Sequence, residues 1–347
     1  MPAYPSIRRS AARFACLGMF TALPLLQQAV AQSSGTSWGA VVQENDVDYL
    51  PLDTLRSFYK FTPVPAAPNS GQLAVSSGGF PIVFTPGTAK INMGGYECRM
   101  VHPSARQRNG DLLISQADAV KTFDPILRPT YITPRRLIRT IVIDPGHGGS
   151  DDGVYANQIR ESELTQQIAT TLQDLLTKRG YKVLLTRDKN SSVSDQRRVE
   201  TLQQADAPLF ISLHVNSGRS DISGIETYCM QPAEPGKAFR PGNTCDAENM
   251  ALAFCLHASL ISATGAQDGA CRRARYSLLS SVSCPAALVE VGYATNPEEA
   301  ALLSTPEYRE KLALAMADGI STFAKAINPD ATIPSTTAPI DTTLPPD

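Results

Sequence analysis

The stretch "TIVIDPGHGGSDDG", residues 140–153, runs from an apolar strand into a glycine-rich turn that carries a histidine. Three consecutive apolar residues, 141–143, are typical of a strand that is buried on both faces. Glycines at 146, 148 and 149 leave the imidazole of His147 uncovered and let another group approach the backbone. A histidine that only fills a core does not need this clearance. The turn therefore predicts that His147 faces another functional group.

Downstream of this stretch, strand-like and helix-like segments alternate along the chain. Residues 161–180 predict a helix, because Leu164, Ile168 and Leu172 fall on one face and Gly180 ends it. Alternation of this kind predicts an α/β domain over 138–327, a twisted, mostly parallel sheet with helices on both faces. The other strands are expected at 181–187, 208–216, 224–230 and 285–293, and the other helices at 194–207, 247–265 and 297–327.

The part of the chain before this domain has a different pattern. Residues 46–127 combine short strands, Gly-containing turns and short helices, which predicts a small α+β domain. Its self-similar strand–cap–helix segments resemble copper amine oxidase N-terminal-like modules, and that resemblance implies a structural or wall-binding module without copper ligands. The flanking segments are expected to be a Ser/Gly-rich linker at 32–45, a connection at 128–136 and a Pro/Thr-rich, disordered tail at 328–347.

The first 31 residues have the pattern of a cleavable signal peptide. Three arginines precede the apolar run "FACLGMFTALPLL", and "AVA" at 29–31 forms a small-residue cleavage site. The run is too short for an ordinary transmembrane helix, so no membrane anchor is expected after cleavage. We expect export to the periplasm, with full secretion as the alternative.

Composition and charge describe an ordinary globular protein. The chain has 347 residues, of which 42% are hydrophobic, enough to build about two domains with a substantial core. Its formal net charge is −2, and no segment is strongly basic. Nucleic acid is therefore excluded as an expected partner.

The cysteines indicate disulfides in an exported chain. Six remain after removal of residues 1–31, and no two of them form a CxxC pair typical of a structural zinc knuckle. Six cysteines allow fifteen pairings, and the sequence does not choose among them. The six are Cys98, Cys229, Cys245, Cys255, Cys271 and Cys284.

Polar groups follow three of the predicted buried strands. His147, His214 and Glu290 each end an apolar run, and Glu161 begins the first helix at the same sheet edge. In open α/β sheets the working site lies at the carboxyl ends of the strands. Two imidazoles and a carboxylate form a known catalytic zinc shell, and a further carboxylate can take a proton from water.

Each of these residues also has an ordinary structural explanation. A single strand-end histidine is more often a hydrogen-bonded structural residue, and Glu161 alone is an acid favoured by the helix macrodipole. Glu290 alone fits a buried acid with satisfied hydrogen bonds. The presence of all four at one edge favours a catalytic site over coincidence.

The motifs at 138–325 resemble the zinc-dependent N-acetylmuramoyl-L-alanine amidases of the amidase type 3 family. The matching pieces are "IVIDPGHGGSDDG", "RESELT", "YKVLLTR", "FISLHVNS", "GIETY" and "LVEVGYATNPEE", in the family order. The resemblance implies one Zn²⁺ held by His147, Glu161 and His214, with Glu290 as the catalytic glutamate. Asn216, just beyond His214, is placed to touch substrate. The chain departs from the family pattern at Pro208 and at 267–271, away from the metal shell.

The resemblance implies hydrolysis of the amide between N-acetylmuramic acid and L-alanine in peptidoglycan, for wall remodelling or cell separation. Another zinc hydrolase of wall peptides and a non-catalytic wall-binding protein remain alternatives. A serine hydrolase is disfavoured because no GxSxG motif is present. The short, Pro/Gly-rich segment 230–247 predicts that no internal helix blocks the cleft, and we expect a monomer.

Overall fold

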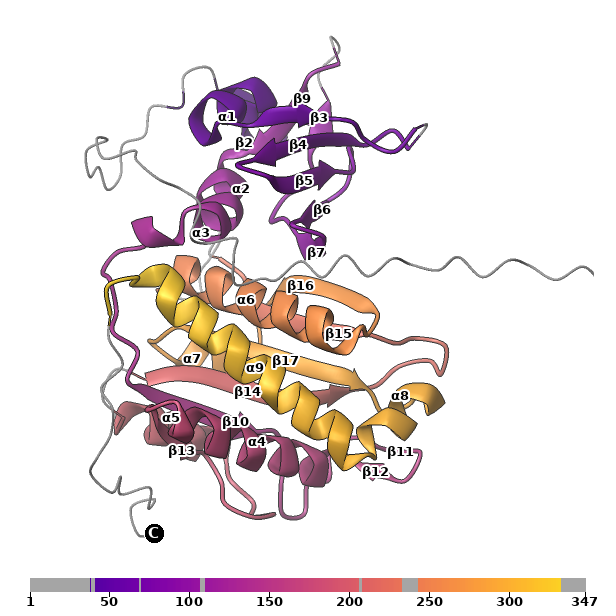
Figure 1. Ribbon diagram of the computed structural model, residues 1–347, viewed down its shortest axis with the longest axis vertical. Coiled ribbons are helices and arrows are strands. Elements are labelled where there is room, and N and C mark those ends of the chain that lie inside the picture. The colour runs from indigo at the N-terminus through magenta and orange to yellow at the C-terminus, as the bar shows by residue number, and fades with distance from the viewer. Residues whose placement is uncertain are drawn as a thin grey trace, which may run out of the picture. The chain divides into compact units, whose positions relative to one another are not determined.

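The computed structural model describes residues 38, 41–68, 70–106, 110–205, 208–232 and 243–331 (Figure 1). All of them belong to one compact unit, Ser37–Asp347. The predicted signal peptide and nearly all of the predicted tail lie outside the described residues. So do residues 233–242, the centre of the segment predicted not to form a blocking helix. None of the described helices has the length and apolar character needed to cross a membrane.

The predicted α/β sheet forms the centre of the molecule. Strands β13, β10, β14 and β17 lie side by side and run parallel, whereas β15 joins β17 in the antiparallel direction and pairs in parallel with β16. Strands β13, β10, β14 and β17 confirm the predicted mostly parallel arrangement, whereas β15 is reversed against β17 and β16 was not predicted. The strands span Thr140–Pro145 (β10), Lys182–Leu185 (β13), Pro208–Asn216 (β14), Ile225–Met230 (β15), Asp268–Ala274 (β16) and Ala286–Tyr293 (β17).

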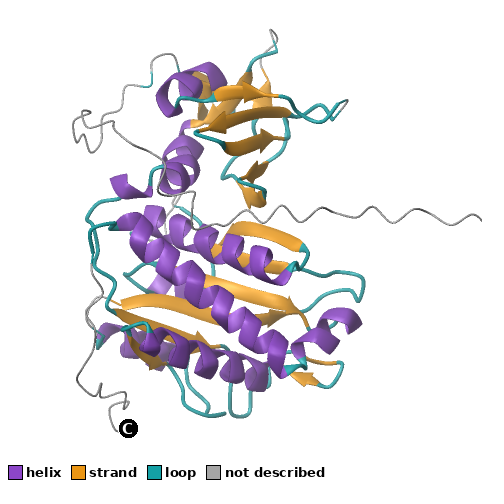
Figure 2. Ribbon diagram, viewed as in Figure 1, coloured by secondary structure: helices purple, strands orange, loops and turns teal. Residues whose placement is uncertain are grey.

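Helices cover both faces of this sheet, as the sequence predicts (Figure 2). Helices α4 (Glu161–Lys178), α6 (Asp246–Thr264) and α9 (Pro306–Ile327) pack on one face, and α5 (Asp195–Gln203) and α7 (Ser277–Ser281) lie on the other. Successive residues of β10 point to opposite faces, so Ile141 and Ile143 join one hydrophobic cluster and Val142 joins the second. The short helix α8, Pro297–Leu303, precedes α9.

The N-terminal strands continue the same sheet. Strands β3 to β7 form successive antiparallel pairs, and β7 pairs in parallel with β16 through Cys98 and Cys271. They span Thr62–Val64 (β3), Leu73–Ser77 (β4), Phe80–Phe84 (β5), Lys90–Met93 (β6) and Tyr96–Arg99 (β7).

A second, four-stranded sheet accompanies these hairpins, in the order β1, β2, β9, β8. Strand β1 lies within the range expected to be a linker, where its backbone pairs with β2. The sheet comprises Val42–Glu44 (β1), Val47–Pro51 (β2), Ala105–Arg106 (β8) and Leu112–Ser115 (β9). Its helical segments are α1 (Leu52–Tyr59), α2 (Gln116–Asp118), a π-helical turn (Ala119–Phe123), α3 (Asp124–Leu127) and a 3₁₀ turn (Pro129–Tyr131). A two-stranded hairpin, β11 (Tyr155–Ala156) and β12 (Ile159–Arg160), precedes α4.

Candidate metal centre and active site

The structure brings His147, Glu161 and His214 together at the carboxyl ends of neighbouring parallel strands. His147 follows β10, His214 lies near the end of β14, and Glu161 is the first residue of α4. One ligand atom from each lies within 4.8 Å of the others. Within the part of the chain that the structure describes, no other group of three histidine, cysteine or acidic side chains comes this close.

Two glycines make room for this convergence. A Cβ atom on Gly146 would lie 2.4 Å from Cε1 of His214, so the residue before His147 must lack a side chain. A Cβ atom on Gly153 would lie 2.5 Å from Oε2 of Glu161, and the φ of Gly153 is +65°. Of the glycines predicted to give clearance, Gly146 makes room for His214, whereas Gly153, which was not singled out, makes room for Glu161.

Glu161 is the centre of the cluster. Its side chain is 2% exposed, and its two oxygens face different histidines. Oε1 lies 2.9 Å from Nδ1 of His214, and Oε2 lies 3.3 Å from Nε2 of His147. The backbone N–H groups of Val154 and Val215 also donate to this carboxylate. These bonds fix its orientation toward both rings.

A carboxylate outside the cluster orients His147. Nδ1 of His147 hydrogen-bonds Oδ2 of Asp151 at 2.8 Å, which leaves Nε2 directed toward Glu161. A carboxylate bonded to the far nitrogen is the usual arrangement around a metal-binding histidine, because it fixes the tautomer and the ring plane. The sequence analysis did not identify Asp151, although the residue lies within the opening motif.

His147 and Glu161 shift each other's pKa. The hydrogen bond to Glu161 outweighs burial and raises the pKa of His147 to about 9. Burial acts to raise the pKa of Glu161, but hydrogen bonds from His147 and His214 outweigh it and hold that pKa well below its ordinary range. In the metal-free protein, protonated His147 therefore balances the negative charge of the Glu161 carboxylate.

Zinc binding at pH 7 is expected to release about one proton per chain. His147, with a pKa of about 9, is protonated at this pH in the metal-free protein, whereas a zinc ligand must be neutral. Isothermal titration calorimetry in two buffers of different ionisation enthalpy measures the release. The release should fall as the pH rises from 7 toward 9, because His147 is then partly neutral before zinc binds, and a release that does not fall would contradict the assignment of His147.

Glu290 lies beside the three residues, on β17. In the sheet register it is opposite His214 on one side and opposite Glu226 on the other. Its side chain is buried, and Oε2 has no hydrogen-bond partner among the described residues. Burial is the largest influence that raises its pKa to about 7. A carboxylate with these properties is suited to exchange a proton near neutral pH.

Asn216 occupies the end of β14, but its amide is already engaged. Nδ2 of Asn216 donates to Oε2 of Glu226 at 3.0 Å. Glu226 also accepts from the hydroxyl of Tyr228 at 2.6 Å and pairs with Nη2 of Arg272 at 2.8 Å. The sequence analysis quoted Glu226 within "GIETY" without assigning it a role. Asn216, Tyr228 and Arg272 thus hold the Glu226 carboxylate, and Glu226 is opposite Glu290 in the sheet register.

Two buried arginines support the turn that carries His147. Arg198 pairs with Asp144, whose other oxygen accepts from Ser212 at 3.0 Å, and Nη2 of Arg198 donates to the His147 carbonyl at 2.8 Å. Arg187 donates to the carbonyls of Pro145 and Gly146. The sequence analysis found no role for either arginine, because their partners are distant in the chain.

Replacing Arg198 by alanine is expected to lower the free energy of unfolding by about 3–5 kcal/mol, because Asp144 then stays buried without its cation. Urea unfolding measures this loss. The neighbouring Arg197→Ala is the matched control, since its pair with Glu200 lies at the surface and contributes about 1 kcal/mol or less. Equal losses in both variants would contradict a structural role for the buried pair.

The regions where the sequence departs from the family pattern lie outside the cluster. Pro208 is the first residue of β14. In the segment 267–271, Asp268 accepts from the backbone N–H of Glu97 at 2.8 Å and from Nε2 of His257 at 2.9 Å. Asp268 thus connects β16 to β7.

The donor set fits zinc. Two imidazoles and one carboxylate are the ligand types of catalytic zinc sites, which keep one position open. Glu290 is opposite His214 in the sheet register, and its Oε2 has no hydrogen-bond partner among the described residues. The three residues could therefore hold a metal ion, with a further carboxylate close to one of them.

Comparisons with known proteins identify the family of this chain. Residues 141–322 match the Amidase_3 family model, described as N-acetylmuramoyl-L-alanine amidase. The sporulation-specific N-acetylmuramoyl-L-alanine amidase of Bacillus subtilis is 32% identical over 182 residues, 52% of this chain and 66% of that protein. The amidase LytC of the same organism is 30% identical over 185 residues, 53% of this chain and 35% of its own length.

The chain is also similar to solved structures. The amidase AmiC2 of Nostoc punctiforme is 30% identical, with a TM-score of 0.48, and the match covers 54% of this chain and 97% of that one. The catalytic domain of CwlV from Paenibacillus polymyxa is 28% identical, also with a TM-score of 0.48, covering 54% and 99%. The family match spans more than half of the chain, and the protein belongs to the Amidase_3 family of N-acetylmuramoyl-L-alanine amidases. Its enzyme class is therefore that of an amide hydrolase. The comparisons do not extend to the copper amine oxidase-like resemblance of the N-terminal part.

Proposed function

We propose that this chain is a zinc-dependent enzyme that hydrolyses the amide bond between N-acetylmuramic acid and L-alanine in peptidoglycan. The observation that carries the proposal is the convergence of His147, Glu161 and His214 beside a buried carboxylate without a partner. Family membership supports the choice of the amide bond.

His147, Glu161 and His214 would hold one zinc ion. When bound, zinc supplies Lewis-acid chemistry, activating water near neutral pH and polarising the carbonyl of the scissile amide. Asp151 holds the ring of His147 in place, and the Val154 and Val215 N–H groups hold Glu161. The ligands are thus oriented before substrate arrives.

Glu290 is the proposed general base and acid. Oε2, which has no partner among the described residues, accepts a proton from the attacking water and then delivers it to the nitrogen of the leaving L-alanine. Asn216 lies at the same edge and is proposed to contact substrate, with its amide oriented by Glu226.

The setting of the enzyme follows from the same proposal. An enzyme acting on peptidoglycan works outside the cytoplasm, and we place it in the periplasm after removal of residues 1–31. Its role would be wall remodelling or cell separation, as a monomer that needs no displacement of an internal helix. The range 46–127 is proposed as a structural or wall-binding module.

Digestion of purified peptidoglycan tests the function. The chain is incubated with and without a chelator, and the new chain ends are identified by mass spectrometry. New amino groups on L-alanine without new reducing sugars are expected, with loss on chelation and return on addition of zinc.

The alternatives give different products. New amino termini on other residues would identify a zinc hydrolase of wall peptides. No new ends from protein that holds zinc would identify a non-catalytic wall-binding protein. Activity that appears only after a partner protein is added would contradict the absence of autoinhibition.

A further inference from the structure

Two cysteines lie opposite each other where the N-terminal strands meet the catalytic sheet. Cys98 on β7 and Cys271 on β16 are register partners in a parallel pair, and both are 0% exposed. Neighbouring strands lie about 4.8 Å apart, within the Cα separation that a disulfide spans. Both are free thiols in the structure, and each shifts the pKa of the other, so the two sulfurs lie near each other.

We propose that Cys98 and Cys271 form a disulfide that covalently joins β7 to β16. Strand β7 ends the N-terminal run of hairpins, and β16 belongs to the sheet that carries Glu226 and Glu290. The bond would therefore fasten residues 42–106 to the catalytic part at the point where the two share a sheet.

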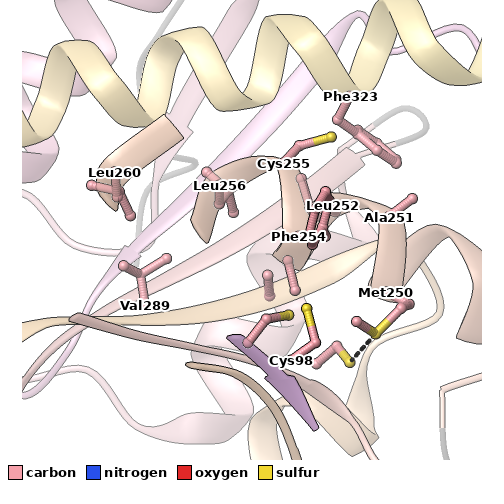
Figure 3. Packing of buried hydrophobic residues seen from close by; sticks show 14 of the residues in the cluster. Cys98, Met250, Ala251, Leu252, Phe254, Cys255, Leu256, Leu260, Val289 and Phe323 are labelled. Carbon is pink, nitrogen blue, oxygen red and sulfur yellow. Dashed lines mark hydrogen bonds between the residues drawn. The ribbon is translucent and has the colours of Figure 1, made fainter. Parts of the chain in front are cut away.

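Neighbouring contacts support this pairing over the nearby alternative. The Asp268 carboxylate accepts from the Glu97 N–H at 2.8 Å, which holds β7 in register with β16 one residue before Cys98. Cys229 on β15 is opposite Arg273, and its sulfur instead contacts Met250 Sδ at 3.7 Å. Cys98 and Met250 belong to the same cluster of buried hydrophobic residues (Figure 3). Register and side-chain contacts thus favour Cys98 as the partner of Cys271.

A metal does not explain this cysteine cluster. Among described residues, only His147, Glu161 and His214 come close enough together to share an ion.

The oxidation is a thiol–disulfide exchange with a dithiol oxidant in its disulfide form, either a protein or a small molecule. The Cys271 thiolate attacks one sulfur of that disulfide and releases the other as a thiolate. Cys98 then loses its proton and attacks the Cys271 sulfur, which releases the second thiolate of the oxidant. Two thiols lose two protons and two electrons in total, and the oxidant is reduced. Because both sulfurs are fully buried in the fold, we place this step during folding, before β7 closes on β16.

The bond would also stabilise one wall of the active site. Arg272 follows Cys271 directly and pairs with Glu226, which is opposite Glu290 in the sheet register. A covalent link at Cys271 limits separation of β16 from β7 and holds this wall in place. The pairing itself does not depend on the proposed enzymatic function.

Peptide mapping tests the pairing directly. The full chain is refolded in a mixture of reduced and oxidised glutathione, denatured with N-ethylmaleimide but no reductant, digested and analysed by mass spectrometry. We expect a cross-linked peptide pair containing Cys98 and Cys271, which disappears on reduction. Maleimide on both residues, or a Cys229–Cys271 cross-link, would overturn the proposal.

Thermal unfolding of serine variants provides a second test. Cys98→Ser and Cys271→Ser should each lower Tm by roughly 5–10 °C, because the unfolded chain is no longer constrained. The double variant should lose no more than either single one, since one bond is broken in every case. Cys255→Ser is the matched control, a buried cysteine on α6 whose replacement should leave the cross-link intact. Additive losses from the two single variants would contradict a shared bond, and the mapping on the unmodified chain decides the matter if the variants do not fold.

Discussion

Replacing Glu290 by glutamine is expected to reduce peptidoglycan hydrolysis by about 10²- to 10⁴-fold while zinc stays bound. Glutamine has nearly the same shape but cannot accept the proton of the attacking water. Oε2 of Glu290 has no hydrogen-bond partner among described residues, so the amide breaks no bond at that atom. The measurement is the rate at which L-alanine amino groups appear, with zinc content determined in parallel.

Glu298→Gln is the matched control for this variant. Glu298 is exposed in the first turn of α8, away from the cluster, and its replacement should leave the rate unchanged. If Glu290→Gln keeps more than a tenth of the activity, another group takes the proton.

In the metal-free protein above pH 7, Glu290→Gln is expected to raise the free energy of unfolding, although it lowers activity. Burial raises the pKa of Glu290 to about 7, so its contribution to stability is complete below pH 4.5 and is lost as the pH rises through 7. Above that pH, the glutamine variant should therefore be more stable than the unmodified chain, by up to about 3 kcal/mol. Urea unfolding at pH 4 and pH 8 checks the sign, and lower stability of the variant at pH 8 would contradict it.

Replacing Glu161 by alanine is expected to reduce bound zinc from about one ion per chain to almost none and to abolish hydrolysis. The change removes one of three proposed ligands and the carboxylate that faces both His147 and His214. Two imidazoles alone form an incomplete shell for a catalytic zinc ion. Zinc content is measured by elemental mass spectrometry after dialysis, and hydrolysis by the same assay of chain ends.

Glu163→Ala is the control on the same helix, because Glu163 is 57% exposed and pairs only with Arg160 at the surface. It should bind zinc and hydrolyse peptidoglycan normally. Glu161→Gln tests the charge separately, since its one remaining oxygen can still accept from a backbone N–H, whereas its amide nitrogen cannot replace the second oxygen as an acceptor. Full zinc occupancy in Glu161→Ala would show that this residue is not a ligand.

Local patterns were sufficient to predict the main elements. Helix α4 was expected from the spacing of Leu164, Ile168 and Leu172, and these three side chains are buried. A helix was expected to begin at 194, and the hydroxyl of Ser194 caps α5 by accepting from the Arg197 N–H. Such features depend on residues three or four positions apart, which the sequence displays directly.

The site was predictable for a similar reason. Apolar runs ending in His147, His214 and Glu290 show that parallel strands deliver these groups to one sheet edge. Supporting residues were not predictable in this way. Arg198 meets Asp144 across 54 positions, and nothing near either residue identifies its partner.

The sequence by itself determined the α/β class, most of the helices and strands and the edge at which the polar groups meet, because these follow from periodicity and from where each buried run stops. It did not reveal β16 or α7. Only the tertiary structure decided the reversed direction of β15, the pairing of β7 with β16 and the burial of the arginines beneath His147. Strand order and direction depend on which surfaces pack best across the whole chain, and the contacts that stabilise them join residues far apart in sequence. For that reason Glu226 opposite Glu290, and Cys98 opposite Cys271, could be recognised only after the chain was folded.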